Sequence, residues 1–453
     1  MSATEEFQNL KWEDGLVGTI EKTLEKYPVK KLYKRGLATA ITSICIPDLK
    51  QWNEIGDVTP NHFLIIIDSS GKFKTPPFKE ILNFINIFFP NLKAPARFTI
   101  EGFIEHVTGN EEKGIDPHPC GLILRDEISR LAVEKSQKQF SGLLAFLCEL
   151  WNGYIEGYRT RTYGFEGGCD AFYSFVGASN HAFLRKMDEE FWEIGLGARA
   201  EFLTNIEIKF DMYSDEFFWS SSNLVKHKVA FEKIAVMMQQ IMAANLKRAY
   251  VLPDADQLWR EYEYKCRQHA NSLLKKDPYG NEIIVTLIAK KAQKVLKLAM
   301  NYGASRMTFE DHTLHICLED MQRAIDDEEE YYKNALEVYS KWKKVRNKKE
   351  KQLTLPKSTT KINEYLELAV KLEGLCSTSE VKKMLGDSNA TNITKIFLDG
   401  RDIGLFEYYC DRFNPKKKLN VEELKRFKGM GPIPDIFKVT EEGYKKAKEL
   451  GYC

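Results

Sequence analysis

The sequence lacks the features that mark membrane proteins, secreted proteins and metal-stapled domains. No apolar stretch reaches the roughly 20 residues that a membrane-spanning helix needs. The N-terminal stretch MSATEEFQNLKWEDG is acidic and carries no apolar signal segment. The nine cysteines are scattered, without a CxxC pair and without a histidine at zinc-ligand spacing. These absences favour a cytoplasmic protein with reduced thiols, no membrane partner and no structural metal.

An excess of charge of one sign is also absent, because 66 Lys and Arg face 65 Asp and Glu. The overall charge therefore indicates nothing about a nucleic-acid partner, and only local patches can do so. What the chain does have is length and apolar content. At 453 residues and 43% hydrophobic residues, it is long enough for two or three domains with ordinary cores.

Hydrophobic periodicity divides the chain into regions. Residues 1–58 are expected to form a helical N-terminal segment and residues 223–345 a second helical region, because apolar residues recur there at three-to-four spacing. Between them, in 59–222, the short apolar runs FLIII, FTI, GLIL and AFYSFVGA alternate with helical stretches, which predicts an α/β domain with a mostly parallel sheet. The basic, proline-bearing stretch at 346–360 is the predicted linker, and 361–453 are the predicted C-terminal domain.

The stretch DSSGKFKT, residues 68–75, has the outline of a phosphate-binding loop. In such loops backbone N–H groups hold phosphate oxygens, a lysine reaches the β and γ phosphates, and a Ser or Thr binds Mg²⁺. Lys74 and Thr75 stand at the expected end, whereas Asp68 and Phe73 replace the usual first and sixth glycines. An ordinary strand, turn and helix remains an open alternative for this stretch alone. The candidate nucleotide-binding residues are Ser69, Ser70, Gly71, Lys72, Phe73, Lys74, Thr75 and Pro76.

Three further segments carry polar residues where apolar runs end. GLIL is followed by Arg125 and then Asp126-Glu127, a pair suited to organising Mg²⁺ and polarising water, or else a solvated acidic turn. AFYSFVGA ends at Ser179-Asn180, where an amide can orient the attacking water or simply cap a helix. GLGARAEFL carries Arg199, which could stabilise phosphate charge from a neighbouring subunit or be an ordinary solvated arginine.

Taken together and in this order, these motifs resemble the AAA+ ATPases, and more narrowly the minichromosome maintenance (MCM) helicases and related ATPases of mobile elements. The resemblance covers roughly residues 60–335 and implies a P-loop α/β core with a helical lid. It implies that Thr75 and Asp126 hold Mg²⁺, that Glu127 activates water and that Asn180 orients it. It also implies that Arg199 acts as an arginine finger.

The helical lid is expected in KKAQKVLKLAMNYGASR and the following CLEDMQRAI. There Lys290 falls near the family's sensor-2 arginine and joins the candidate nucleotide-binding residues. The sequence departs from the family's pattern at Lys290 itself, at Asp68 and Phe73, and at Arg125 before the acidic pair.

The interval between the acidic pair and Asn180 suggests a DNA contact. In WNGYIEGYRTRTYGFEGGCDAFY, two strand-like pieces flank a glycine-containing turn. By resemblance this is a hairpin that projects into a central channel, with Arg159 and Arg161 on DNA, aided by Tyr158 and Tyr163. Alternating arginine and aromatic residues also suit single-strand binding on physical grounds. A surface hairpin with a solvated face is the alternative.

The last hundred residues resemble a winged-helix domain. Ser377 or Thr378 is the expected N-cap of one of its helices. Winged helices also mediate protein contacts, so duplex DNA binding is one of two readings. The candidate DNA contacts in this region are Asn392, Lys395, Arg401, Lys416, Lys417 and Lys418.

The sequence therefore predicts an ATP-dependent DNA motor that uses Mg²⁺ and forms a homo-oligomeric ring on single-stranded DNA. By resemblance it would be an MCM-like replicative helicase of a mobile element, virus or archaeal-type replicon. One alternative is a weak or inactive AAA+ DNA-binding initiator or scaffold, which the missing glycines favour. Another is a AAA+ regulator or transposition ATPase directed to DNA by its winged helix.

Overall fold

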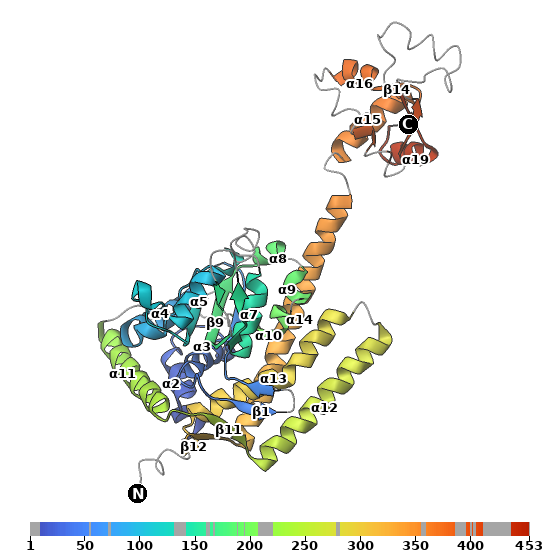
Figure 1. The fold of residues 1–453 in the computed structure, drawn as a ribbon. Helices are drawn as coiled ribbons and strands as arrows, with labels where there is room; N and C mark the ends of the chain where they lie inside the picture. The colour runs from blue at the N-terminus through green and yellow to red at the C-terminus, as the bar shows by residue number, and fades with distance from the viewer. Residues whose placement is uncertain are drawn as a thin grey trace. The chain divides into compact units, whose positions relative to one another are not determined.

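The computed structural model describes residues 10–53, 56–70, 74–130, 142–159, 164–165, 168–187, 189–193, 195–206, 221–277, 281–354, 359–385, 396–398, 401, 405–410 and 436–452. The chain divides into two compact units, Met1–Lys343 and Lys344–Cys453. Each unit has its own cluster of buried apolar side chains. The protein is a mixed α/β structure with many helices and a parallel sheet (Figure 1).

The first unit is largely helical. Its helices and 3-10 turns are η1 (Trp12–Asp14), α2 (Leu16–Thr23), α3 (Lys31–Ser43), α4 (Thr75–Phe88), η2 (Pro90–Leu92), α5 (Ile100–Thr108), η3 (Glu111–Lys113), η4 (Ile128–Arg130), α7 (Leu143–Asn152), α8 (Phe183–Lys186), α9 (Glu190–Glu193), α10 (Leu196–Arg199), α11 (Ser221–Ala243), α12 (Pro253–Lys276), α13 (Glu282–Ser305) and α14 (Leu318–Thr354).

A four-stranded parallel sheet forms the centre of this unit, in the order β10-β3-β9-β4. Its strands are β3 (Phe63–Ile67), β4 (Cys120–Arg125), β9 (Phe172–Ser179) and β10 (Glu201–Leu203). Every residue of β3 and β9 is buried, which explains why both read as continuous apolar runs rather than alternating ones. The runs FLIII, GLIL and AFYSFVGA are thus confirmed as strands.

The register places three strand ends at one edge of the sheet. Ile67 pairs with Ser179, and Arg125 pairs with Gly177. The residues that follow β3, β4 and β9 therefore emerge together, as carboxyl ends of parallel strands do.

Helix α3 packs directly on this sheet, against β3 and β9. A Cβ at Gly36 would lie 2.9 Å from the Leu64 side chain, so the helix and strand approach closely only because this residue is glycine. Buried Arg35 ties the helix to its neighbours through Glu21 at 2.6 Å and Asp327 at 2.5 Å. The first-unit core is thus continuous from α2 and α3 through the sheet to α14.

Several small strands lie where the sequence suggested helix. β1 (Gln51–Asn53) and β2 (Gly56–Val58) pair antiparallel inside the segment expected to be helical to residue 58. β11 (Arg248–Val251), β12 (Phe309–Glu310) and β13 (Thr313–Ile316) form a three-stranded sheet within the second helical region. These strands are two to four residues long, too short for a period of two to stand out from their helical surroundings.

The run FTI is not a strand, contrary to the expectation from its apolar residues. Ile100 begins α5, and the Thr99 hydroxyl accepts a hydrogen bond from the Gly102 N–H at 3.1 Å. A threonine that caps the first turn favours helix over strand here. The predicted linker differs as well, because α14 continues through its first part to Thr354.

The second unit contains α15 (Thr359–Lys371), β14 (Leu375–Ser377), α16 (Thr378–Leu385), β15 (Phe406–Cys410), β16 (Ile436–Val439) and α19 (Glu441–Glu449). Its strands form an antiparallel sheet in the order β14-β16-β15. Ser377 is confirmed as the cap of α16: its hydroxyl accepts from the Glu380 N–H at 3.1 Å, while the Glu380 carboxylate accepts from the Ser377 N–H at 2.9 Å.

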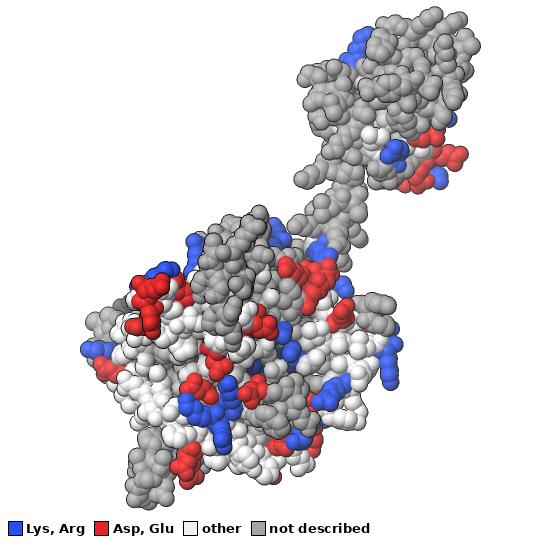
Figure 2. Space-filling view, viewed as in Figure 1, with Lys and Arg blue, Asp and Glu red and all other residues white. Residues whose placement is uncertain are grey.

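Charged side chains of both signs are mixed over the visible face of the first unit (Figure 2). The described Lys and Arg residues there lie in small groups among Asp and Glu. A DNA contact on this face would depend on a local feature rather than on a broad basic surface. Among the helices described, none combines the length and apolar content needed to cross a membrane.

Candidate nucleotide-binding site

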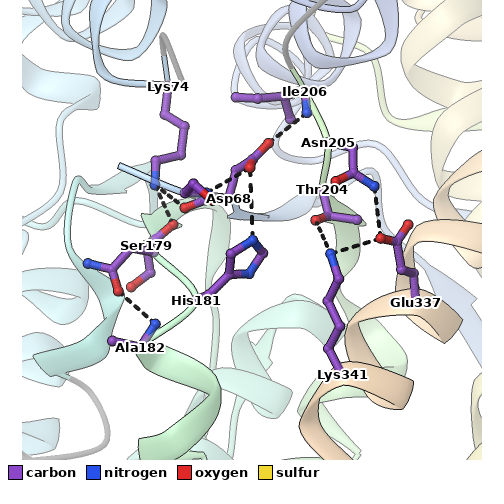
Figure 3. A network of polar contacts seen from close by, with 12 residues as sticks. Asp68, Lys74, Ser179, His181, Ala182, Thr204, Asn205, Ile206, Glu337 and Lys341 are labelled. Carbon is purple, nitrogen blue, oxygen red and sulfur yellow. Dashed lines mark hydrogen bonds and ion pairs between the residues drawn. The ribbon is translucent and has the colours of Figure 1, made fainter. Parts of the chain in front are cut away.

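Lys74 lies at the edge of the sheet where β3 and β9 end. Its Nζ donates to the backbone carbonyl of Asp68 at 2.6 Å and to that of Ser179 at 2.7 Å (Figure 3). The residue immediately precedes α4, whose first turn contains Pro76 and Pro77. Proline is tolerated there because the first N–H groups of a helix have no intrahelical acceptor. The ammonium group is thus held among strand-end carbonyls at the start of a helix.

The acidic pair lies at the same edge, close to the start of α4. The Thr75 hydroxyl donates to Asp126 Oδ1 at 3.4 Å, which joins the end of the loop to the end of β4. Glu127 Oε1 accepts from the Ser179 hydroxyl at 2.6 Å and from the Ser129 N–H at 3.0 Å. The structure therefore brings together the loop, the acidic pair and the end of β9, which are far apart in the sequence.

The charges at this edge influence one another. Burial lowers the pKa of Lys74, against the opposing pull of the Asp68, Glu127 and Asp126 carboxylates. Burial alone would raise the pKa of Glu127, but hydrogen bonds from Ser179 and Ser129 and the charge of Lys74 outweigh it, so its pKa is lowered. Glu127 is therefore a carboxylate at neutral pH.

The donor set suits a divalent cation. The carboxylates of Asp68, Asp126 and Glu127 all act electrostatically on the Lys74 ammonium group, so negative charge is in excess at this edge. The Thr75 hydroxyl and the Asp126 carboxylate supply oxygen ligands, which Mg²⁺ prefers. Because Mg²⁺ usually takes only one or two protein ligands beside phosphate oxygens, two such groups are sufficient.

Asp68, which stands where the family has a glycine, is buried and fully engaged. Its Oδ1 accepts from the Ser69 N–H at 2.7 Å, and its Oδ2 accepts from the Ile206 N–H at 2.8 Å. His181 Nε2 lies 3.9 Å from Oδ1 (Figure 3). The backbone at Asp68 does not have positive φ, so glycine is not required at this position. The carboxylate joins the loop to the segment after β10.

Asn180 follows β9 at the same edge. Its Oδ1 accepts from the Ala182 N–H at 2.8 Å, which is the capping contact considered as the alternative to a sensor. The amide of Asn180 is only half-buried. Next to it, burial lowers the pKa of His181, with further lowering by Lys341 and opposition from Asp68. His181 is neutral at pH 7 and faces the buried Asp68 carboxylate.

A second set of contacts joins the segment after β10 to α14. The Thr204 N–H donates to Asn334 at 3.1 Å, and Asn205 donates to Glu337 at 2.8 Å. Lys341 forms an ion pair with Glu337 at 2.8 Å (Figure 3). No local motif marks these residues, or His181 and Ile206, because their contacts join segments more than 100 residues apart.

Arg199 and Lys290 lie at the opposite edge of the sheet. Glu201, at the start of β10, pairs with Leu64, near the start of β3. Arg199 precedes β10, so its backbone lies at the edge of the sheet opposite the one where β3 and β9 end. Arg199 Cζ and Lys290 Nζ lie 5.6 and 5.7 Å from the centroid of the Trp151 ring. Lys290 therefore lies beside Arg199 at the Trp151 ring, and its predicted contact with a nucleotide stays a prediction.

The predicted hairpin is present in its described part. Tyr154–Ile155 (β5) pairs with Cys169–Asp170 (β8), and Tyr158–Arg159 (β6) pairs with Gly164–Phe165 (β7), both antiparallel. Arg159 thus lies on a hairpin strand. Arg401 is exposed in the second unit. The other candidates outside the described residues are Gly71, Lys72, Phe73, Arg161, Tyr163, Asn392, Lys395, Lys416, Lys417 and Lys418.

Comparisons with known proteins give a distant structural likeness and no sequence match. No protein-family model matches the sequence, and no curated protein sequence matches it either. Among solved structures, the chain is similar to a full-length MCM homolog from Methanopyrus kandleri, with a TM-score of 0.41 and 12% identity. The match covers 74% of this chain and 62% of that chain, which is less than two thirds of its length.

Proposed function

We propose that the first unit is a AAA+-type P-loop ATPase core that binds ATP with Mg²⁺ at the Lys74 edge. The observation that carries this proposal is the convergence of Lys74, the pair Asp126-Glu127 and Asn180 at the carboxyl ends of neighbouring parallel strands. Ligands of α/β sheets bind at that edge. The start of α4 offers N–H groups for phosphate binding, and Lys74 can exchange its two carbonyl acceptors for phosphate oxygens.

In this proposal each residue of the site has a separate role. Thr75 and Asp126 hold Mg²⁺, which would neutralise charge on the phosphates. Glu127, kept ionised by its hydrogen bonds, accepts a proton from the attacking water. Asn180 orients that water through its amide. The backbone N–H of Ser70 would hold a phosphate oxygen, since that of Ser69 already donates to Asp68.

Arg199 and Lys290 are assigned to the nucleotide of a neighbouring chain. Since they lie at the edge opposite Lys74, they cannot complete the site of their own chain. A head-to-tail contact would place them at the next chain's phosphates, and repeating that contact gives a ring. An arginine supplied in this way stabilises transition-state charge.

The wider function is an ATP-dependent DNA motor, in our proposal an MCM-like replicative helicase of a mobile element, virus or archaeal-type replicon. The hairpin that carries Arg159 would contact single-stranded DNA. The helices and three-stranded antiparallel sheet of the second unit suit a winged-helix domain that contacts duplex DNA. ATP hydrolysis would then move the hairpin along the strand.

Calorimetric titration with ATP and Mg²⁺ tests the nucleotide site. Lys74→Ala should weaken ATP binding at least about tenfold, because it removes a charge-assisted contact worth about 1.5–3 kcal/mol. Lys79→Ala is the matched control, since Lys79 is an exposed lysine of the same helix. The control should bind ATP like the wild type.

Wild-type protein that binds no ATP would contradict the ATPase proposal. It would favour the alternative of a DNA-binding initiator or scaffold with the same fold, for which the replaced glycines at Asp68 and Phe73 are the supporting feature. Equal ATP affinity in Lys74→Ala and the wild type would remove Lys74 from the site.

A further inference from the structure

Trp151, the penultimate residue of α7, is surrounded by three cations. Its ring is buried, and its centroid lies 4.1 Å from Lys297 Nζ, 5.6 Å from Arg199 Cζ and 5.7 Å from Lys290 Nζ. A cation near an indole is attracted by the ring quadrupole, and the attraction grows to about 2 kcal/mol when both are removed from water. Trp151 is thus a common contact for the two residues assigned to a neighbour's nucleotide.

Lys297 contacts both the ring and the carbonyl of Trp151. It is fully buried, and no carboxylate in the described part of the chain lies within ion-pair distance of it. Its Nζ donates to the carbonyl of Trp151 at 2.8 Å, to the carbonyl of Thr59 at 2.8 Å and to the Thr59 hydroxyl at 3.3 Å. The last carbonyls of a helix have no intrahelical donor, so Lys297 satisfies and stabilises the carboxyl end of α7.

The hairpin starts directly after this helix end. Gly153, at φ +81°, terminates α7, and its carbonyl accepts from the Ala171 N–H at 2.9 Å. A Cβ at Gly153 would lie 2.8 Å from the Thr59 side chain, the residue that also accepts from Lys297. Any displacement of the end of α7 is therefore transmitted to Tyr154–Ile155, the first strand of the hairpin.

We propose that Trp151 is a positioning residue that couples the Arg199 and Lys290 pair to the hairpin, a proposal that rests on the proposed ATPase function. When a neighbour's phosphates attract Arg199 and Lys290, these cations exchange the indole for an anion, and of the three cations only Lys297 remains at Trp151. The balance of contacts at the end of α7 then differs between the nucleotide-free and nucleotide-bound assemblies. A ligand shifts a conformational equilibrium only when its contacts with the two conformations differ.

The test is the affinity for a labelled single-stranded oligonucleotide, with and without a non-hydrolysable ATP analogue. In the wild type, coupling of about 1–3 kcal/mol corresponds to a ratio of about 5- to 150-fold between the DNA affinities with and without the analogue. Trp151→Leu should bring that ratio close to one. Trp151→Phe, which keeps an aromatic face, should give an intermediate ratio.

Trp192→Leu is the matched control. Trp192 is equally buried in the same unit, but its ring packs against Phe202 at 5.5 Å and Tyr339 at 5.4 Å. The Trp192→Leu variant should keep the wild-type ratio of DNA affinities with and without the analogue. A wild-type ratio in Trp151→Leu, or an equal loss in Trp192→Leu, overturns the proposal. If Trp151→Leu does not fold, wild-type ratios in both Trp151→Phe and Lys297→Met overturn it instead.

Two outcomes for the wild type separate this inference from the proposed function. A wild type that does not bind the ATP analogue in calorimetry removes the ATPase proposal and this inference with it. A wild type that binds the analogue but holds DNA with the same affinity in its presence and absence overturns the coupling through Trp151 alone.

Discussion

Asp68 shows how a side chain that departs from a motif can have a structural role of its own. In the sequence, Asp68 stands where phosphate-binding loops usually have their first glycine. In the structure both of its oxygens accept backbone N–H groups, from Ser69 and Ile206, and the residue is buried. Ile206 lies 138 residues further along the chain. No sequence pattern within the loop could have revealed that contact.

Replacing Asp68 by the glycine that is usual in phosphate-binding loops should therefore destabilise the protein rather than improve ATP binding. Asp68→Gly leaves the buried Ile206 N–H without its acceptor, which should lower the free energy of unfolding by about 1–3 kcal/mol. Urea denaturation measures this change. Ser70→Ala, at an exposed position of the same loop, should stay within about 0.5 kcal/mol of the wild type. Tighter ATP binding at unchanged stability in Asp68→Gly would contradict this role.

The other residues of the site were predictable to different degrees. Lys74, Thr75, Asp126 and Glu127 could be chosen from the sequence because each lies beside an apolar run that ends in polar residues. The hydrogen bonds that tune them could not, since Ser179 contacts Glu127 from another strand. Lys290 was named by resemblance as a nucleotide-binding candidate, and no sequence pattern could show that its ammonium group lies beside the Trp151 ring.

At the scale of elements, three segments meet at a buried charge cluster. Lys294 of α13 lies 2.6 Å from Glu201 at the start of β10 and 3.0 Å from Glu328 of α14. All three residues are buried. Burial and the neighbouring Glu201 raise the pKa of Glu328 well above its ordinary value. One lysine cannot neutralise two carboxylates, so the cluster favours a proton on Glu328.

This cluster predicts how stability depends on pH. Glu328 binds its proton more tightly in the folded protein than in the unfolded chain, so its contribution is fully present below pH 4.5 and is lost as the pH rises through the folded-state pKa. Glu328→Gln cannot ionise and should lack this loss. Thermal unfolding from pH 5 to 9 should show the wild type losing stability relative to the variant as the pH rises. Parallel curves for the two proteins would contradict the assignment.

Long elements were predictable and short ones were not. The buried strands β3 and β9 and the long helices α13 and α14 follow from apolar runs and periodicity. The four-residue strand at Arg248–Val251 and the hairpin at Gln51–Val58 carry too few residues for a period to be recognised. At Thr99, a single cap decides for helix where three apolar or β-favouring residues suggest a strand.

At the scale of the whole molecule, the two halves of the proposed catalytic apparatus lie at opposite edges of one sheet. Lys74 and Glu127 follow the carboxyl ends of β3 and β4, whereas Arg199 precedes β10. In this proposal Arg199 therefore serves the phosphates of a neighbouring chain. The proposed ATPase is complete only when two chains meet, so hydrolysis should require assembly. The sequence offered Arg199 as a candidate, and the parallel register gives the reason for a second chain.

The most direct test is ATP turnover by two variants, measured separately and after mixing. Glu127→Gln removes the proposed base, and Arg199→Ala removes the proposed finger, so each alone should lose about 10³-fold or more in turnover. Arg185→Ala, at an exposed arginine, should keep the wild-type rate. In an equal mixture, about a quarter of the head-to-tail interfaces combine an intact Glu127 with an intact Arg199 from the next chain, so turnover should recover to about that fraction of the wild-type rate. A mixture as inactive as its components, or an Arg199→Ala protein as active as the wild type, would contradict a site shared between chains.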